Sequence, residues 1–78
     1  MEDVSIKKKE WKMNNKIRVA RAEVRMTQQQ LADAVCVSRQ TINAIESGKF
    51  VPSTVLALKI ARTFEKQVEE IFSLEEED

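Results

Sequence analysis

Histidine is absent from the 78-residue sequence, and cysteine, glycine and proline occur once each. A structural zinc site takes four thiolate or imidazole ligands. Cys36 is the only side chain of these kinds in the sequence, so we do not expect a metal site. The same count excludes an internal disulfide. Without an imidazole base beside a nucleophile, and with only Gly48 for a phosphate-binding loop, the sequence favours neither an enzyme nor a cofactor-binding protein.

Long apolar runs are missing as well. No stretch approaches the roughly 20 apolar residues that span a membrane, and residues 1–13 lack the apolar segment of a secretory signal. We therefore expect a cytoplasmic protein without a membrane segment. The length allows one domain with a modest core, because a chain this short buries only about 60% of the surface that its unfolded form exposes.

The charges are unevenly distributed, although the formal net charge is zero. Residues 7–62 carry twelve Lys and Arg against four Asp and Glu, whereas residues 65–78 carry one against seven. A basic segment of this kind attracts a polyanion, and the acidic end is expected to stay solvated or to point away from it. The alternative interpretation is an ordinary solvated surface without a binding role.

Apolar spacing and capping residues predict an all-α domain of five helices, with no strand pattern longer than two residues. Thr27 and Gln30 match a capping box, in which each side chain satisfies a free backbone amide of the other residue, and Ser38 and Ser53 are further capping residues. The expected helices are residues 15–25, 28–34, 38–47, 53–64 and a short segment around Val68, Ile71 and Phe72. We divide the chain into an N-terminal arm (1–13), this domain (14–73) and an acidic tail (74–78).

Only three residues, 35–37, separate the second expected helix from the third. So short a connection sets the two helices at a steep angle, which is the spacing of a helix-turn-helix. Ala32 provides a small side chain where the helices would touch, and Val37 and Ile42 are apolar residues that would lie beneath the turn.

The segment from Thr27 to Lys49, TQQQLADAVCVSRQTINAIESGK, resembles the signature of the Cro and phage-repressor (XRE-like) family of transcriptional regulators. The resemblance extends from about Lys16 to Phe72. It implies a five-helix repressor-like fold that binds double-stranded DNA as a homodimer, with the third helix in the major groove. Repression by blocking polymerase is the simplest role that it implies, and activation remains open.

The resemblance also assigns contacts with DNA. Base contacts fall to Arg39 and Gln40, since arginine suits guanine O6 and N7 and glutamine suits adenine N6 and N7, while Ala44 offers only a methyl contact. Phosphate is favoured near helix ends, where free N–H groups and the helix dipole attract anions. The expected contacts with the DNA backbone are Gln28, Ser38, Thr41, Asn43, Ser47 and Lys49.

Two further positions have a structural interpretation. Arg21 and Glu46 match a pair that bridges the first helix to the end of the third in relatives, so we expect an ion pair rather than direct contact with DNA. Cys36 stands where the family usually has glycine, at a turn position that often needs a positive φ, at a cost of about 1 kcal/mol. An inert thiol is favoured there over a redox switch.

The C-terminal part of the domain supplies candidates for dimerisation, because family members often dimerise through this end. Phe64, Val68 and Ile71 are expected in the core, and Phe72 and Leu74 at the dimer interface. We expect Trp11 to pack against the helices, with contact along DNA as the alternative. A protein-interaction or antitoxin-like module with the same fold is the alternative function, in which the acidic tail and the apolar end bind another polypeptide.

Overall fold

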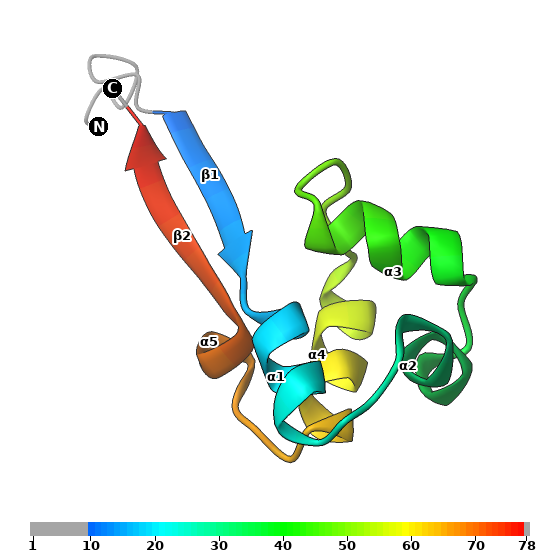
Figure 1. Cartoon of the computed structure of the whole chain (residues 1–78). Coiled ribbons are helices and arrows are strands. Elements are labelled where there is room, and N and C mark those ends of the chain that lie inside the picture. The colour runs from blue at the N-terminus through cyan, green and yellow to red at the C-terminus, as the bar shows by residue number, and fades with distance from the viewer. Residues whose placement is uncertain (1–9, 78) are drawn as a thin grey trace.

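The computed structural model describes residues 10–77, which form five helices and one two-stranded sheet (Figure 1). The two strands come first and last along the described chain, so the helices lie between them in sequence. In chain order the elements are β1 (Glu10–Asn15), α1 (Ile17–Glu23), α2 (Gln28–Val35), α3 (Arg39–Glu46), α4 (Thr54–Thr63), α5 (Val68–Ile71) and β2 (Phe72–Glu77). No helix within residues 10–77 is long and apolar enough to cross a membrane.

Capping side chains begin α2, α3 and α4. The predicted capping box is present at α2, where Gln30 N donates to Thr27 Oγ1 at 3.0 Å and Thr27 N donates to Gln30 Oε1 at 2.9 Å. The hydroxyls of Ser38 and Ser53 each accept from the amide three residues later, at 3.1 Å. Such a cap stabilises a helix by about 1 kcal/mol, because it satisfies an amide that has no partner inside the helix. The starts of these three helices therefore agree with the prediction.

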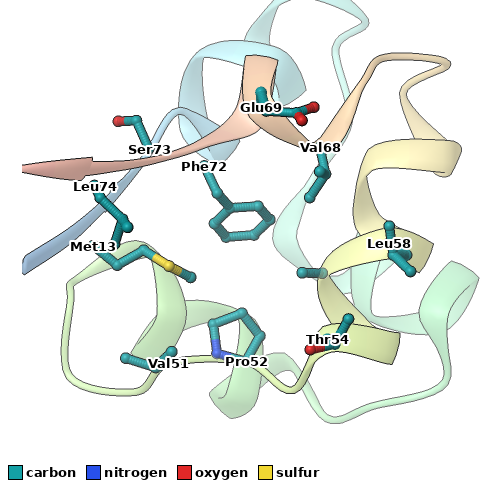
Figure 2. A pocket seen from close by; sticks show the side chains of 11 residues that line it. Met13, Val51, Pro52, Thr54, Leu58, Val68, Glu69, Phe72, Ser73 and Leu74 are labelled. Carbon is teal, nitrogen blue, oxygen red and sulfur yellow. The ribbon is translucent and has the colours of Figure 1, made fainter. Parts of the chain in front are cut away.

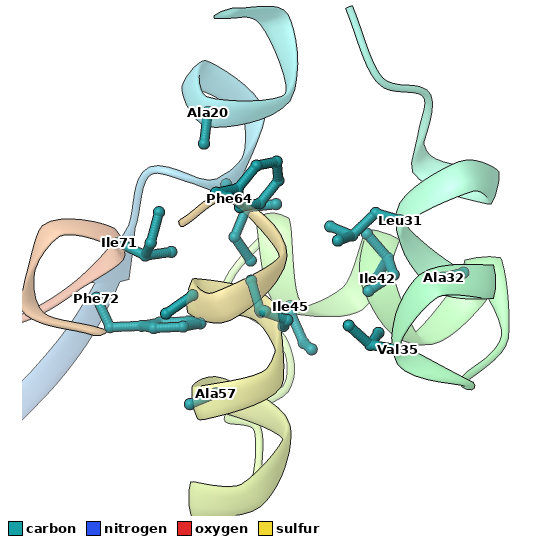
Figure 3. Packing of buried hydrophobic residues seen from close by; sticks show 13 residues of the cluster. Ala20, Leu31, Ala32, Val35, Ile42, Ile45, Ala57, Phe64, Ile71 and Phe72 are labelled. Carbon is teal, nitrogen blue, oxygen red and sulfur yellow. The ribbon is translucent and has the colours of Figure 1, made fainter. Parts of the chain in front are cut away.

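The core forms where the apolar sides of the five helices meet (Figure 3). Each of the first four helices contributes a large side chain with no exposed surface, namely Ile17, Leu31, Ile42 and Ile60. Full burial of a side chain of this size contributes about 1.5–3 kcal/mol. The other members of the cluster are Ala20, Ala32, Val35, Ile45, Ala57, Ala61, Phe64, Ile71 and Phe72.

The two-stranded sheet corrects the expected all-α fold class. β1 and β2 pair antiparallel, with Glu10 opposite Glu77 and Asn15 opposite Phe72, and the resulting hairpin-like ribbon extends beyond the helices (Figure 1). Each strand has only two apolar residues in alternation, too few to mark a strand, and glutamate, which is depleted in strands, fills the outer half of β2. We call this pair of strands the β ribbon.

Two aromatic residues lie elsewhere than expected. Phe72, a predicted dimer contact, is 8% exposed and belongs to the core, because it is the first residue of β2, at the point where that strand leaves α5. Trp11, predicted to pack against the helices, is 59% exposed, since β1 carries it along the outer part of the β ribbon. Leu74, the other dimer candidate, is also largely exposed.

Candidate nucleic-acid interface

A residue in the left-handed conformation makes the turn between α2 and α3. Cys36 has φ 63° and ψ 46°, which confirms the positive φ expected at this position. Its amide donates to Asp33 O at 3.3 Å, and the amide of Val37 donates to Ala32 O at 3.0 Å, so carbonyls at the end of α2 are satisfied. Ala32 is fully buried, and its small side chain allows α3 to pack closely against α2. The thiol of Cys36 is exposed.

The side chains of α3 separate into a buried face and an outer face. Ile42 and Ile45 are buried in the core, with 0% and 2% of their surface exposed. Arg39, Gln40 and Asn43 are exposed. Because residues three and four apart share one side of a helix, Gln40, Asn43 and the half-buried Ala44 form a single stripe, with Arg39 beside it. The predicted base-contacting residues thus lie together on the solvent side of α3.

Glu46, the last residue of α3, is fixed by a cluster of donors. Arg21 of α1 donates to it through two nitrogens, with Nε 2.7 Å from Oε2 and Nη2 3.1 Å from Oε1. The exposed Arg18 contributes a weaker contact, with its Nε 3.6 Å from Oε1. The Glu46 side chain has no exposed surface, and that of Arg21 is 15% exposed. A third bond from Arg21, Nη1 to Met26 O at 2.9 Å, holds the guanidinium on the loop after α1.

Opposing effects set the pKa of Glu46. Burial raises the pKa, because it penalises the charged carboxylate. Hydrogen bonds from Arg21 and Gln28, together with the positive charges of Arg21 and Arg18, outweigh burial and lower the pKa of Glu46 below its ordinary value. The carboxylate is therefore ionised at neutral pH, and its charge is neutralised inside the fold.

The burial of Glu46 decides the charge of the surface around α3. Between Asp33 and Glu65 it is the only acidic residue in the sequence. Since its side chain is buried and paired, no carboxylate from residues 34–64 reaches solvent to oppose the exposed cations there. Those cations include Arg39 at the start of α3 and Lys49 just after its end. The outer surface of α3 is consequently neutral to basic, which suits a polyanion.

Gln28, the first residue of α2, joins three groups of α3 with one side-chain amide. Its Nε2 donates to Glu46 Oε1 at 3.0 Å and to Asn43 Oδ1 at 3.2 Å. Its Oε1 accepts from Nη1 of Arg39 at 3.5 Å. Sequence reasoning placed Gln28 only at the DNA backbone, whereas the structure also connects it to the buried ion pair and to Arg39. No local signal identifies such bonds, because they join separate helices.

Comparison with known proteins agrees with this geometry. A family model described as helix-turn-helix matches residues 17–71. The chain belongs to the helix-turn-helix family. The resemblance to Cro-type regulators is thereby confirmed.

Relatives of this helix-turn-helix protein come from bacteria and archaea. The uncharacterized HTH-type transcriptional regulator YgzD of Bacillus subtilis is 47% identical over 66 residues, covering 85% of this chain and 100% of the relative. The uncharacterized HTH-type transcriptional regulator MJ0272 of Methanocaldococcus jannaschii is 48% identical over 66 residues, with the same coverage. A crystal structure of a "putative DNA-binding protein" from Bacteroides fragilis superposes with a TM-score of 0.72 at 30% identity, covering 78% of this chain and 98% of that one.

The remaining polar residues predicted at the interface surround the ends of α3 in this helix-turn-helix protein. The hydroxyl of Ser38 lies 3.0 Å from that of Thr41, at the start of the helix. Ser47 Oγ donates to Ala44 O at 3.2 Å, and the amide of Lys49 donates to the same carbonyl at 2.9 Å. Among residues 10–77, no group of three or more acidic, Cys or His side chains could hold a metal ion.

Asn15 is a positioning residue that sequence reasoning missed. Its Oδ1 accepts from the amide of Ile17, the first residue of α1, at 3.1 Å, and its Nδ2 donates to Ile45 O at 2.9 Å. The side chain therefore connects the end of β1 to the last turn of α3. The available signal was an asparagine two residues before an apolar periodic segment, since asparagine side chains often accept from free amides at a helix start.

Proposed function

We propose that this chain binds double-stranded DNA sequence-specifically, with α3 in the major groove, and represses transcription as a homodimer. The observation that carries the proposal is the outer face of α3, where Arg39 and Gln40 are exposed at the N-terminal end and the one carboxylate of residues 34–64, that of Glu46, is buried. In helix-turn-helix proteins this end of the second helix of the motif contacts the base edges. The family membership and the names of the relatives support the proposal.

Each residue on the outer face has a role in the proposed complex. Arg39 donates two hydrogen bonds to guanine O6 and N7, and Gln40 makes a donor and acceptor pair with adenine N6 and N7. Ala44, one turn further along α3, contributes a methyl contact to thymine. Because its contribution is small, sequence preference rests mainly on two side chains in each half-site.

The polar residues at the ends of α3 hold the phosphates and set the register of the helix in the groove. Lys49 supplies a cation after the helix. Gln28 contacts phosphate through its backbone amide at the start of α2, while its side-chain Oε1, 3.5 Å from Nη1 of Arg39, steadies that arginine. The other proposed phosphate contacts are Ser38, Thr41, Asn43 and Ser47. Two copies would place their α3 helices in successive major grooves, about 34 Å apart, on a two-fold symmetric operator that excludes polymerase.

Selection of bound sequences from a random duplex pool tests this function. For wild type we expect a two-fold symmetric site. Arg39→Ala should relax the preference at one base pair in each half-site by about 1–3 kcal/mol, whereas Lys49→Ala should weaken binding to all sequences about equally. The reverse pattern would overturn the assignment of roles.

A salt titration on a mixed-sequence duplex tests the DNA interface separately from specificity. Binding through phosphate contacts should weaken steeply between about 50 and 200 mM salt, because condensed counterions are released on binding. Absence of binding even at the lowest salt concentration would refute the proposed function and would favour the protein-interaction module instead.

A further inference from the structure

The two faces of the β ribbon differ in polarity. Residues directly opposite one another share a face, so the pairs Met13–Leu74 and Trp11–Glu76 lie on the same side as Phe72. The opposite side carries Lys12 paired with Glu75. Of the apolar residues on this side, Phe72 and part of Met13 are covered by the helices, while Trp11 and Leu74 are 59% and 64% exposed. A ribbon of two strands is marginally stable alone in water, so an uncovered apolar face on it calls for a partner.

An apolar groove lies beside this face, between the β ribbon, the loop after α3, and α4 (Figure 2). Its volume is about 630 Å³. In Figure 2 the ring of Phe72 lies at its centre, with Val51 and Pro52 on one side and Val68 on another. Glu69 is the one charged residue among those that line it, so a partner with an apolar surface fits the groove best.

The apolar surface here is as large as a dimer interface needs. Five large apolar side chains at the groove or beside it are each 48–64% exposed, namely Trp11, Phe50, Val51, Leu58 and Leu74. Together they present roughly 500 Å², if a whole aromatic side chain counts for about 150–250 Å² and an aliphatic one for somewhat less. An interface of standard size buries about 800 Å² per copy, of which about 65%, or ~500 Å², is apolar in homodimers.

We propose that a second copy of this chain occupies the groove, with the apolar face of each β ribbon covering the groove of the other copy. This interface rests on the homodimer of the proposed function and assigns its surface. We place the two-fold axis near Met13 and Leu74, across the strands. Trp11 then lies two residues, about 7 Å, from the axis, on the side away from the helices. Phe72 lies the same distance from the axis on the side of the helices, at the centre of the groove, so Trp11 of one copy faces Phe72 of the other.

Charge and symmetry disfavour two of the ways in which the copies could pair by strand edges. Pairing of two β2 edges would bring the consecutive residues Glu75 and Glu76 of each copy against each other, and like charges across a strand pair are destabilising. Pairing of a β1 edge with a β2 edge is not self-complementary and would continue into an open filament. Face packing avoids both outcomes and buries the apolar side chains.

Sedimentation and fluorescence of the full chain test the interface. Trp11 is the only tryptophan, so its emission reports directly on the proposed contact. As wild type associates, the emission maximum should move to shorter wavelength in step with dimer formation. Leu58→Glu and Val51→Glu, at exposed positions beside the groove, should each raise the dimer dissociation constant about 30-fold or more, because each places a carboxylate in an apolar contact. Val19→Glu is the matched control, since Val19 is similarly exposed on α1, outside the groove.

The outcomes separate this interface from the proposed function. A wild-type dimer whose association and Trp11 emission are unchanged by both groove variants would overturn the interface and leave the homodimer standing. A chain that remains monomeric at all concentrations, with exposed Trp11, would overturn both and leave the groove to an apolar small molecule or another protein. Binding of Leu58→Glu to a mixed-sequence duplex at low salt checks that the DNA interface of this variant is intact. If wild type forms the dimer but binds no duplex, the proposed function is refuted and the dimer interface stands.

Discussion

Replacing Glu46 with leucine is expected to cost this domain much of its stability. The substitution leaves the Arg21 guanidinium, 15% exposed, without the carboxylate that holds two of its nitrogens at 2.7 and 3.1 Å. Loss of one partner of a buried pair costs about 3–5 kcal/mol, and the remaining bond to Met26 O places the expected cost near 3 kcal/mol. A domain of this length has a total free energy of unfolding of about 4–12 kcal/mol. The melting temperature should therefore fall by about 12–24 °C.

Urea denaturation followed by far-UV circular dichroism measures this cost, and a second substitution tests its cause. In Arg21→Met/Glu46→Leu no buried charge is left unpaired, so the double variant should regain most of the lost stability. Arg18→Met is the control, because Arg18 is 72% exposed and its contact is longer, and it should change the free energy of unfolding by less than about 0.5 kcal/mol. A double variant no more stable than Glu46→Leu would refute the argument from an uncompensated charge.

Three further predictions concern stability. The pKa of Glu46 is lower in the folded chain than its ordinary value of 4.5, so its contribution to the free energy of unfolding is fully present above pH 4.5 and is lost as the pH falls through the folded-state pKa. In a series of denaturation curves at decreasing pH, the difference in stability between wild type and Glu46→Leu should therefore narrow. Cys36→Gly should raise the free energy of unfolding by up to about 1 kcal/mol, since glycine adopts positive φ without strain, whereas Cys36→Ala should leave urea midpoints nearly unchanged. Ser38→Ala should lower the melting temperature by about 4–8 °C, equivalent to loss of a cap worth ~1 kcal/mol, and an unchanged melting temperature would contradict the capping role.

The helical part of the fold could be predicted because its signals are local. Thr27 and Gln30 are three residues apart and cap the same helix, and the serines before α3 and α4 act within one turn. The left-handed turn at Cys36 could be expected from the resemblance, because the family usually has glycine at this position between the two helices. In each case the residues that decide the conformation are neighbours in the sequence.

The β ribbon and the contacts of Gln28 could not be predicted, because their partners lie far along the chain. Trp11 and Met13 alternate with polar residues, but what makes them a strand is a partner more than sixty residues later, at Leu74 and Glu76. Glutamine is a residue type that is common at an exposed helix start, and only the packing of α2 on α3 brings the side-chain amide of Gln28 within 3.0 Å of Glu46. Base contacts by Arg39 and Gln40 stay a prediction.

The β ribbon also affects the order in which the molecule is completed. Its pairs join residues more than fifty positions apart, so their closure costs more chain entropy than the contacts between successive helices. During synthesis from the N-terminus, α2, α3 and α4 have emerged before any residue of β2 has. The amide of Lys16 donates to Ile71 O at 2.8 Å, immediately before that strand, and β1 has no partner strand until β2 is made. The junction between β1 and α1, although early in the chain, is therefore completed only when the end of α5 and β2 have been made.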